Sequence, residues 1–318
     1  MPAPFDLRRL DVPVVQAGMG TVARHELAAA VSEAGGLGTI AGARAPIAAE
    51  LDHARRLTGR PIAVNLLLPF VRPGDVEAAA AADVIVTFWG VPRRLAATTW
   101  IHQCGSVDEA KAAAAAGADG VIAQGVEAGG HVRGTTPALD LLEQVRRAVN
   151  IPVLVAGGIV DVEGVREALE AGAAAAVVGT RFLLSAECRA HQEYKKRCIE
   201  ASETVLTEFF GLGWPDAPHR VIPNVVTRRW VGSDARGPRW IRTGNRIASH
   251  LANMMPAAAQ DRAVATQLPP WLPFAVPQPP TDDAPAALVD GRPLYAGASV
   301  GRITDIRPAA ELVRLLTP

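Results

Sequence analysis

The segment Asp119-Gly-Val-Ile-Ala-Gln-Gly-Val-Glu-Ala-Gly-Gly-His131-Val-Arg-Gly134 joins a short apolar run to a glycine-rich turn that carries a histidine. The apolar part, Asp119–Ala123, is typical of a buried strand. Gly129 and Gly130 permit a close backbone approach, and His131 has an ordinary pKa of about 6.5, near neutrality. A strand that ends in such a turn is typical of a site at the mouth of a parallel barrel. A glycine turn with a solvated histidine has the same sequence, and these residues alone do not separate the two interpretations.

The rest of the chain repeats the pattern of a short β-type run followed by an Ala-rich helical run. Such alternation predicts βα units and a parallel sheet. Eight strands are the number that closes a (β/α)8 barrel, so we predict an α/β protein with a TIM-barrel fold. A helix is expected after each strand, including a short one between Pro92 and Thr99. The expected strands are Pro13–Ala17, Leu37–Ala41, Pro61–Leu66, Asp83–Thr87, Thr99–Gln103, Asp119–Ala123, Pro152–Ala156 and Ala174–Val178.

The alternation stops after Arg189, which predicts a second, mostly helical domain inserted in or appended to the barrel. We assign residues 1–189 and 294–318 to the barrel, which closes with a helix at Pro308–Leu316. Residues 190–293 form the predicted accessory domain of helices and loops near the barrel mouth. Its part 266–293 is rich in proline and lacks periodicity, which is typical of a loop, a lid or a partly mobile segment.

Composition excludes several classes of protein. The chain has 318 residues, 49% of them apolar, and a formal net charge of zero, so nothing favours nucleic acid or an anionic membrane surface as a partner. No apolar run reaches about 18 residues, and the N-terminus has no signal core, so we expect a cytoplasmic protein. Three cysteines without CxxC spacing indicate neither a disulfide framework nor a metal site. They are Cys104, Cys188 and Cys198.

Polar and glycine residues gather at the carboxyl ends of the predicted strands, where parallel barrels bind ligands. Backbone N–H groups at Gly158 and at Gly179-Thr180 favour an anion such as phosphate. The amides of Asn65 and Gln124 can each donate to and accept from the edge of a heteroaromatic ring. Together they predict a phosphorylated aromatic cofactor, of which FMN is the natural candidate. The alternative is a barrel whose glycines only pack closely and whose amides cap turns.

Other histidines and motifs give weaker signals. No GxGxxG follows a strand, and P-loop and HExxH motifs are absent. His102, at the end of the fifth strand, either lines the site or packs with a hydrogen bond. Arg133 either counters an anionic substrate or is solvated. The remaining histidines are expected to be surface or structural residues, and they are His25, His53, His191, His219 and His250.

Seven motifs, in this order, resemble those of the nitronate monooxygenase family, formerly called 2-nitropropane dioxygenases. The most specific of them is the Glu-Ala-Gly-Gly-His string that ends at His131. The resemblance covers nearly the whole chain and implies an FMN-binding TIM barrel with an extra α-helical domain. The motifs are Pro13-Val-Val-Gln-Ala-Gly-Met-Gly20, Gly35-Gly-Leu-Gly-Thr-Ile40, Val64-Asn65, Gln124-Gly-Val-Glu-Ala-Gly-Gly-His131, Val155-Ala-Gly-Gly-Ile159, Val178-Gly-Thr-Arg-Phe-Leu183 and Ala296-Gly-Ala-Ser-Val-Gly301.

Carried over by position, the resemblance implies His131 as the active-site base and a set of FMN contacts. The chain departs from the family at Ala298, where relatives often have Gln, and at Trp89, where relatives often have a smaller or His-containing sequence. Trp89 is expected to face the flavin or the substrate, and Glu127, Arg133 and Tyr295 are further substrate-side candidates. The implied FMN contacts are Ala17, Gly18, Met19, Asn65, Gln124, Gly129, Gly158, Val177, Val178, Gly179 and Thr180.

The sequence therefore predicts FMN-dependent oxidation of alkyl nitronates, and of nitroalkanes, with O2 as the oxidant. One alternative on the same fold is an NAD(P)H-dependent FMN reductase of quinones or enoyl thioesters, in which His131 is a proton donor or a binding group. An alternative of another class is a non-catalytic flavin-binding protein with an interaction role. A small-molecule substrate is expected in both enzymatic cases. The sequence leaves the physiological substrate and the oligomeric state open.

Overall fold

The computed structural model describes residues 6–7, 10–43, 46–96, 98–232, 234–253 and 276–318. Eight parallel strands form one sheet in the order β1-β9-β8-β6-β5-β4-β3-β2. The edge strands meet where Gln16 N–H donates to Leu37 O over 2.9 Å, and a parallel bridge pairs Val15 with Leu37. The predicted TIM barrel is thus confirmed. Its strands are β1 (Val14–Gln16), β2 (Gly38–Ala41), β3 (Ile62–Leu67), β4 (Val84–Phe88), β5 (Thr99–Cys104), β6 (Gly120–Gln124), β8 (Val153–Ala156) and β9 (Ala176–Val178).

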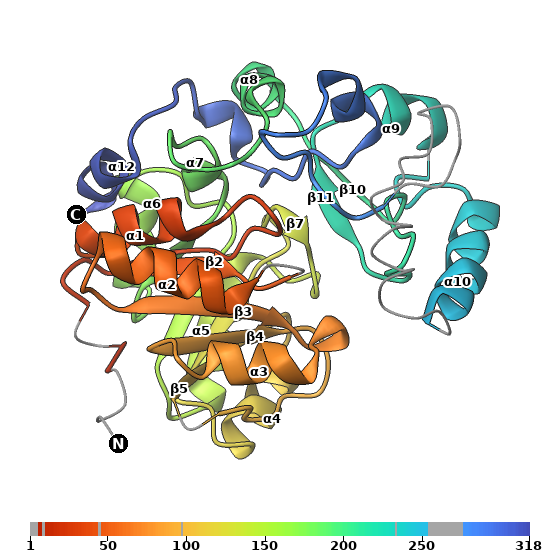
Figure 1. Ribbon diagram of the computed structural model, residues 1–318. Coiled ribbons are helices and arrows are strands. Elements are labelled where there is room, and N and C mark those ends of the chain that lie inside the picture. Colours follow the sequence, from red (N-terminus) through yellow and green to blue (C-terminus); the bar gives the residue numbers. More distant parts are fainter. Residues whose placement is uncertain (1–5, 8–9, 44–45, 97, 233, 254–275) are drawn as a thin grey trace.

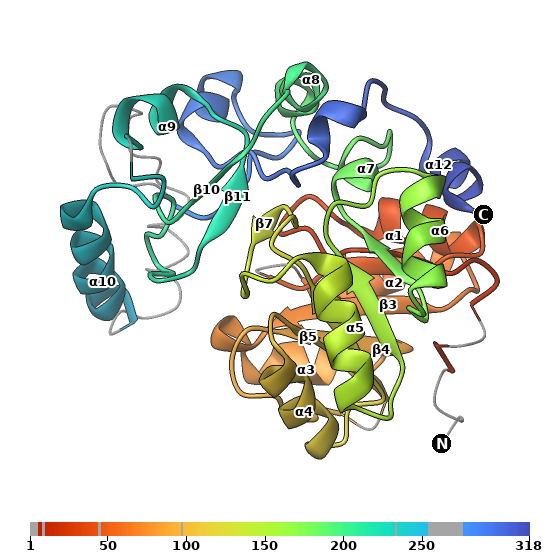
Figure 2. The same ribbon diagram turned by 180° about the vertical axis from the view of Figure 1, so that it is seen from behind.

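Helices that follow the strands lie on the outside of the barrel (Figures 1 and 2). Two of them begin at good N-caps, because Ser106 accepts from Glu109 N–H and Asp161 accepts from Gly164 N–H. The barrel helices are α1 (His25–Glu33), α2 (Ile47–Leu57), α3 (Pro73–Ala79), α4 (Val107–Ala115), α5 (Ala138–Ala148), α6 (Val162–Glu170), α7 (Thr180–Leu183) and α12 (Ala309–Leu316), with short 3-10 turns η2 (Leu68–Phe70) and η4 (Val300–Arg302). A third 3-10 turn, η3 (Ala286–Gly291), lies within residues 190–293.

The prediction of a short helix between β4 and β5 is wrong, because the described residues of that connection contain no helix. The chain instead turns sharply at Trp89 and Gly90, which have φ angles of 64° and 111°. Left-handed angles interrupt a right-handed helix, and Pro92 lacks the N–H group that a helix would use. The connection after β4 is therefore a loop that begins at Trp89.

The core follows the two-residue period of the strands. Val15 and Val177 point into the barrel and pack with Val84, Ile101 and Leu154. Their neighbours Val14 and Val178 point outward and pack against the surrounding helices. This alternation decides which residues of a strand end can reach the mouth of the barrel.

The accessory unit contains a small sheet as well as helices. Strands β10 (Val205–Thr207), β11 (His219–Val221) and β7 (Gly130–His131) pair antiparallel in the order β10-β11-β7. The prediction of a mostly helical domain missed this sheet, because β10 and β11 have only three residues each and their third partner, β7, comes from the barrel part of the chain. The helices are α8 (Gln192–Glu200), α9 (Val225–Trp230) and α10 (Arg239–Asn253).

A separate small core holds this unit together, built from Phe209, Phe210, Val221, Val226 and Ile241. Helix α8 differs, because its residues Tyr194 and Cys198 pack in the main barrel core. We propose that residues 190–293 form the accessory domain and that α8 anchors it to the barrel. Of the proline-rich segment, residues 266–275 lie outside the described residues.

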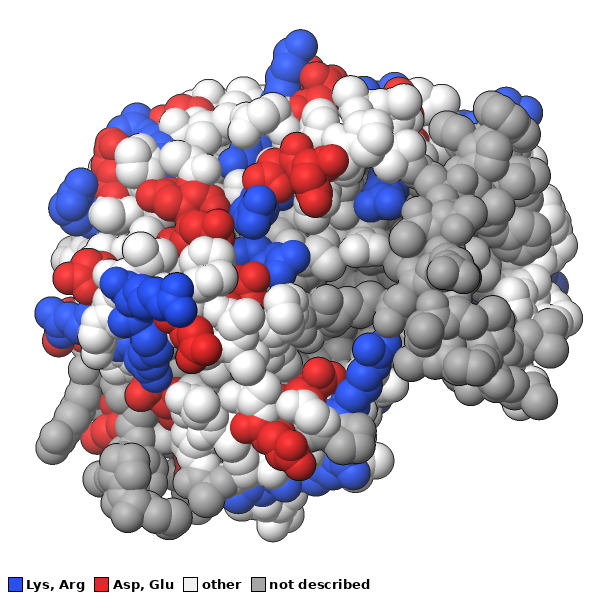
Figure 3. Space-filling view, in the orientation of Figure 1, with Lys and Arg blue, Asp and Glu red and all other residues white. Residues whose placement is uncertain are grey.

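The face of the molecule in Figure 3 carries Lys and Arg interspersed with Asp and Glu. A mixed surface of this kind agrees with the net charge of zero, and the described residues on that face form no single-sign patch. Within the part of the chain that the structure describes, no helix is both long and apolar enough to cross a membrane.

Candidate active site

A cavity of about 280 Å3 lies at the carboxyl ends of the barrel strands and extends to the accessory unit. Residues from β2, β3, β4, β5, β6, β8 and β9 line its barrel side, as the strand polarity of a parallel barrel requires. Gln103, which ends the fifth predicted strand, is among them. Twelve of the residues singled out in the sequence line the cavity, namely Ala17, Gly18, Met19, Asn65, Gln124, Gly129, His131, Gly158, Val177, Gly179, Thr180 and Tyr295.

Four other candidates do not line the cavity. Val178 points outward into the core between the barrel and its helices. The Glu127 carboxylate accepts from Ala138 N–H over 3.1 Å at the start of α5. The guanidinium of Arg133 pairs with Glu109 over 2.6 Å and lies over the ring of Trp89. Trp89 contacts the ring of Trp214, which lines the cavity, but Trp89 does not line it.

His102 adopts the packed arrangement rather than lining the cavity. Its Nδ1 lies 2.8 Å from Thr87 Oγ1, which accepts from the indole N–H of Trp100 over 2.7 Å. Thr87 Oγ1 and His102 Nδ1 thus share a hydrogen bond whose direction follows the tautomer of the ring. Burial lowers the pKa of His102 to about 4, so the ring is neutral near pH 7.

Two segments fix the backbone of His131, namely β11 with the residue before it and the end of β6. In the small sheet His131 pairs with His219 of β11, and Val132 N–H donates to Pro218 O over 2.8 Å. The amide of Gln124 donates to His131 O over 2.9 Å and accepts from Arg133 N–H over 3.2 Å. The nitrogen and the oxygen of this amide thus both hold the His131 turn. The sequence predicted instead that the amide contacts a cofactor ring.

Gly129 brings the same turn against the C-terminal segment. A Cβ atom at Gly129 would lie 2.6 Å from both the carbonyl carbon of Ala296 and the nitrogen of Gly297. Ala298 N–H donates to Glu127 O over 2.9 Å and secures this contact. A side chain at position 129 would therefore push the His131 turn away from its support.

The imidazole of His131 is enclosed by aromatic rings. Trp214 stacks on it, with ring centroids 3.9 Å apart and planes 23° apart, and His219 and Tyr295 lie 5.2 and 5.6 Å away. Burial, and secondarily the nearby His219, lower the pKa of His131 well below 6.5, which keeps the ring neutral. Its Nε2 is buried and has no hydrogen-bond partner among the described residues. Buried polar atoms are normally paired, so this nitrogen is left for a ligand.

His219 is a buried structural residue, as expected, but it lies beside the site. Its Nε2 accepts from Phe210 N–H over 3.2 Å, so its Nδ1 carries the proton and donates to Ala217 O over 2.9 Å. Burial lowers the pKa of His219 to about 4. The neutral ring thus joins the loop before β11 to the strand that supports His131.

His219 is expected to make stability depend on pH. The unfolded chain binds a proton at His219 below about pH 6.5, whereas the folded chain does so only near pH 4, so stability falls as pH drops through this window. The shift corresponds to a loss of about 2 kcal/mol of unfolding free energy between pH 7 and pH 5. Chemical denaturation at both pH values should show a smaller loss in His219→Gln. An unchanged pH dependence in that variant would show that His219 is not the titrating group.

The opposite side of the cavity suits an anion. Gly158 has a φ of 74°, a left-handed angle that favours glycine. The backbone N–H groups of Gly158 and Gly179 donate to no described residue, and both glycines line the cavity. Thr180 Oγ1 accepts from Gly297 N–H over 2.9 Å, which fixes the segment after β9. Free backbone donors in a cavity that is also lined by the amide of Asn65 fit a phosphorylated ring such as FMN.

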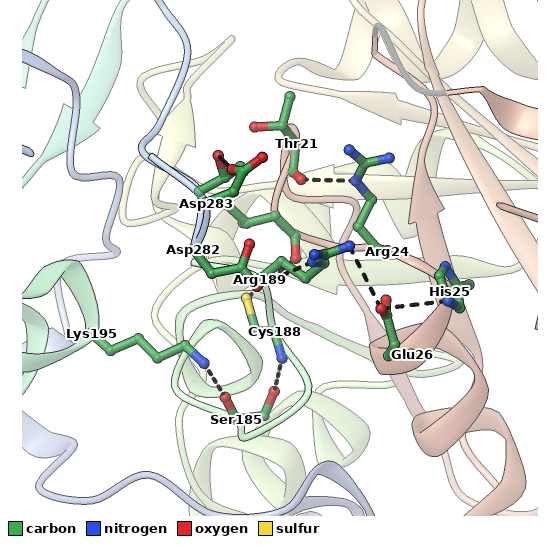
Figure 4. Close-up of polar contacts among 12 residues, drawn as sticks. Thr21, Arg24, His25, Glu26, Ser185, Cys188, Arg189, Lys195, Asp282 and Asp283 are labelled. Carbon is green, nitrogen blue, oxygen red and sulfur yellow. Dashed lines mark hydrogen bonds and ion pairs between the residues drawn. The ribbon is translucent and has the colours of Figure 1, made fainter. Parts of the chain in front are cut away.

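Polar contacts at the rim hold one wall of the cavity in place (Figure 4). Arg189 pairs with Asp282 over 3.2 Å and with Glu26 of α1 over 3.8 Å, and Asp282 N–H donates to Arg189 O over 2.9 Å. These contacts tie the segment after residue 275 to α1 and to the chain before α8. Pro277 and Pro279 of this segment can therefore serve as cavity wall.

Comparison with known proteins identifies the family. The sequence model described as nitronate monooxygenase matches residues 3–97 and 92–318 of the chain. The protein belongs to the nitronate monooxygenase family. Members of this family and the solved relatives below are flavoproteins, and the chain is accordingly a flavin-dependent oxidoreductase. Membership of this family is consistent with a small-molecule substrate. The alternative of a non-catalytic flavin-binding protein is therefore no longer supported.

Three proteins similar to this chain have different named activities. A curated relative from Mycobacterium tuberculosis, named (3aS,4S,5R,7aS)-5-hydroxy-7a-methyl-1-oxo-octahydro-1H-indene-4-carboxyl-CoA dehydrogenase, is 36% identical over 73% of this chain and 69% of its own. The structure of FabK from Thermotoga maritima has 30% identity and a TM-score of 0.75, covering 98% of this chain and 93% of the other. A nitroalkane oxidase from Streptomyces ansochromogenes has 30% identity and a TM-score of 0.72, covering 96% and 95%.

Sequence reasoning missed Trp214 as part of this nitronate monooxygenase-family site. It is followed by Pro215 in a stretch without periodicity, so nothing local marks it as a cavity residue. Its contact with His131 connects residues 83 positions apart, and the pairing of β7 with β11 helps to bring them together.

Proposed function

We propose that this protein oxidises alkyl nitronates, and neutral nitroalkanes after removal of a proton, with FMN as cofactor and O2 as the final oxidant. The observation that carries the proposal is the buried, unpartnered Nε2 of His131 at the wall of the cavity. Bound FMN would take electrons from the substrate and pass them to O2. The protein would supply binding, orientation and the proton acceptor.

The glycine side of the cavity would hold the cofactor. Backbone N–H groups of Gly158 and Gly179 would donate to the phosphate. Both are available for this, because neither donates to a described residue. The amide of Asn65, which donates to Val86 O over 3.3 Å, retains an oxygen that can accept from a ring N–H group. Gly18 permits the close approach of the Asn65 side chain, because a Cβ atom at position 18 would lie 2.5 Å from Asn65 Cβ.

His131 would act on the substrate side. A nitronate is already deprotonated and needs no base, whereas a neutral nitroalkane must lose its α-proton first. The neutral imidazole has a free Nε2 that can accept this proton. The resulting imidazolium would attract the nitronate anion and hold it for oxidation. One histidine can therefore serve proton removal and anion binding in succession.

A second candidate function is a reductase that takes electrons from NAD(P)H and passes them to a quinone or an enoyl thioester. The similarity to FabK over 98% of the chain and to a dehydrogenase of a carboxyl-CoA compound supports it. In this case Nε2 of His131 would bind or protonate the substrate. The same cavity serves both candidates, so only the electron donor separates them.

An anaerobic absorbance titration of the purified protein tests the proposal. The flavin, released by denaturation and identified by chromatography, is expected to be FMN. An alkyl nitronate should bleach the bound flavin in the absence of NADH, and admission of O2 should restore the colour. Bleaching by NADH and none by nitronate would replace the proposal with the reductase. Protein that binds no flavin after FMN is added back would overturn the cofactor assignment.

A further inference from the structure

Trp214 is the part of the accessory unit that reaches the candidate base. It is 7% exposed, lines the cavity and stacks on His131 with ring centroids 3.9 Å apart. Its backbone is held within the accessory unit, because Trp214 N–H donates to Gly211 O and Gly213 N–H donates to Ser249 Oγ of α10, each over 3.0 Å. The indole is therefore a fixed wall rather than a free side chain.

Barrel side chains hold the indole from two other directions. Phe70 of η2 meets Trp214 edge-on with centroids 5.0 Å apart and planes at 83°. Trp89 meets it with centroids 5.0 Å apart and planes at 76°. Edge-to-face arrangements of this kind are a favoured geometry for aromatic pairs. The backbone of Trp89 is left-handed, a strained conformation that persists only where the surrounding structure enforces it.

This arrangement limits how a substrate can reach His131. An indole stacked at 3.9 Å occupies one face of the imidazole, so no substrate atom can lie on that face. Tyr295, whose hydroxyl donates to Pro277 O over 2.8 Å, closes another side. His131 is partly buried and lines the cavity together with Trp214 and Tyr295, so a group beside the imidazole lies between these two rings. Rigid aromatic walls on several sides admit a narrow group and exclude a broad one.

We propose that Trp214 is a specificity-determining residue that restricts the group next to His131 to a short, unbranched alkyl chain. This inference rests on the proposed function, since it takes His131 as the group that meets the substrate anion. A pocket that excludes one or more methylenes discriminates by about 10–200-fold. Truncation of the indole should remove that discrimination without removing His131.

The test measures binding as well as turnover. Propanoate and cyclohexanecarboxylate are unreactive carboxylates with the shape and charge of a small and a bulky nitronate. Their dissociation constants are measured from the absorbance change of the flavin-loaded protein. The wild type is expected to prefer propanoate at least tenfold, and Trp214→Ala to lose or reverse this preference. Trp214→Phe keeps a ring and should retain it. Trp240→Ala, at a 54% exposed tryptophan on α10, is the matched control and should leave both constants unchanged.

Turnover of propyl and cyclohexyl nitronate by the same variants separates this inference from the proposed function. Wild-type protein that oxidises neither nitronate, but whose carboxylate preference is lost in Trp214→Ala, would sink the proposed function and leave the specificity role in place. Equal binding of both carboxylates by the wild type, or an unchanged ratio in Trp214→Ala, would overturn the role of Trp214. So would loss of the preference in Trp240→Ala.

Discussion

Replacing His131 by alanine is expected to lower kcat/KM for a neutral nitroalkane by about 10²–10⁴-fold and to affect the preformed nitronate far less. Only the neutral substrate requires proton removal, and Nε2 of His131 is the buried, unpartnered acceptor at the cavity wall. Steady-state oxygen consumption with nitroethane and with ethyl nitronate measures both values. The proposal concerns the ratio of the two losses, which a general loss of folding would leave unchanged.

The pH profile gives an independent readout of the same residue. Because burial lowers the pKa of His131 well below 6.5, its base form persists as the pH falls below the ordinary range of histidine. Nitroalkane activity should therefore hold between pH 8 and pH 6.5.

His250→Ala, at an exposed histidine of α10, is the matched control for His131→Ala and should keep both activities. Equal losses on both substrates in His131→Ala would remove the assignment of His131 as base.

Replacing Gly129 by alanine is expected to reduce stability by about 1–3 kcal/mol and to lower the flavin content of the purified protein. The added Cβ would lie 2.6 Å from backbone atoms of Ala296 and Gly297, which cannot move aside as a flexible side chain can. Relief of this clash would shift the turn that carries His131 and lines the cavity. Denaturant unfolding and the ratio of flavin to protein absorbance measure the two effects.

Two other glycines separate the clash from other causes. Gly59→Ala introduces the same methyl group with no atom within 4 Å and should leave both readouts unchanged. Gly130→Ala also meets no atom within 4 Å but forces alanine to a φ of 76°. It should cost about 1–2 kcal/mol through backbone strain alone. Wild-type stability and flavin content in Gly129→Ala would show that the close approach is not required.

Local sequence patterns were sufficient for the barrel. Each strand lies within two residues of its predicted bounds, because short apolar runs between helices and glycine turns have a strong signal. The ends of parallel strands share one edge, so the same pattern also predicted that Gly18, Asn65, Gly158 and Gly179 would lie together. They all line the cavity. The connection at Trp89 was missed because a left-handed tryptophan has no sequence signature.

The environment of His131 was decided by tertiary structure. The residues that enclose it, Trp214, His219 and Tyr295, lie between 83 and 164 positions further along the chain, and no periodicity connects such distant segments. Pairing of β7 with β11 brings the first two to the imidazole. Burial by these rings, rather than the histidine itself, keeps the base neutral. The chain thus encodes the candidate base locally, while its protonation state and the shape of its pocket come from packing between distant segments.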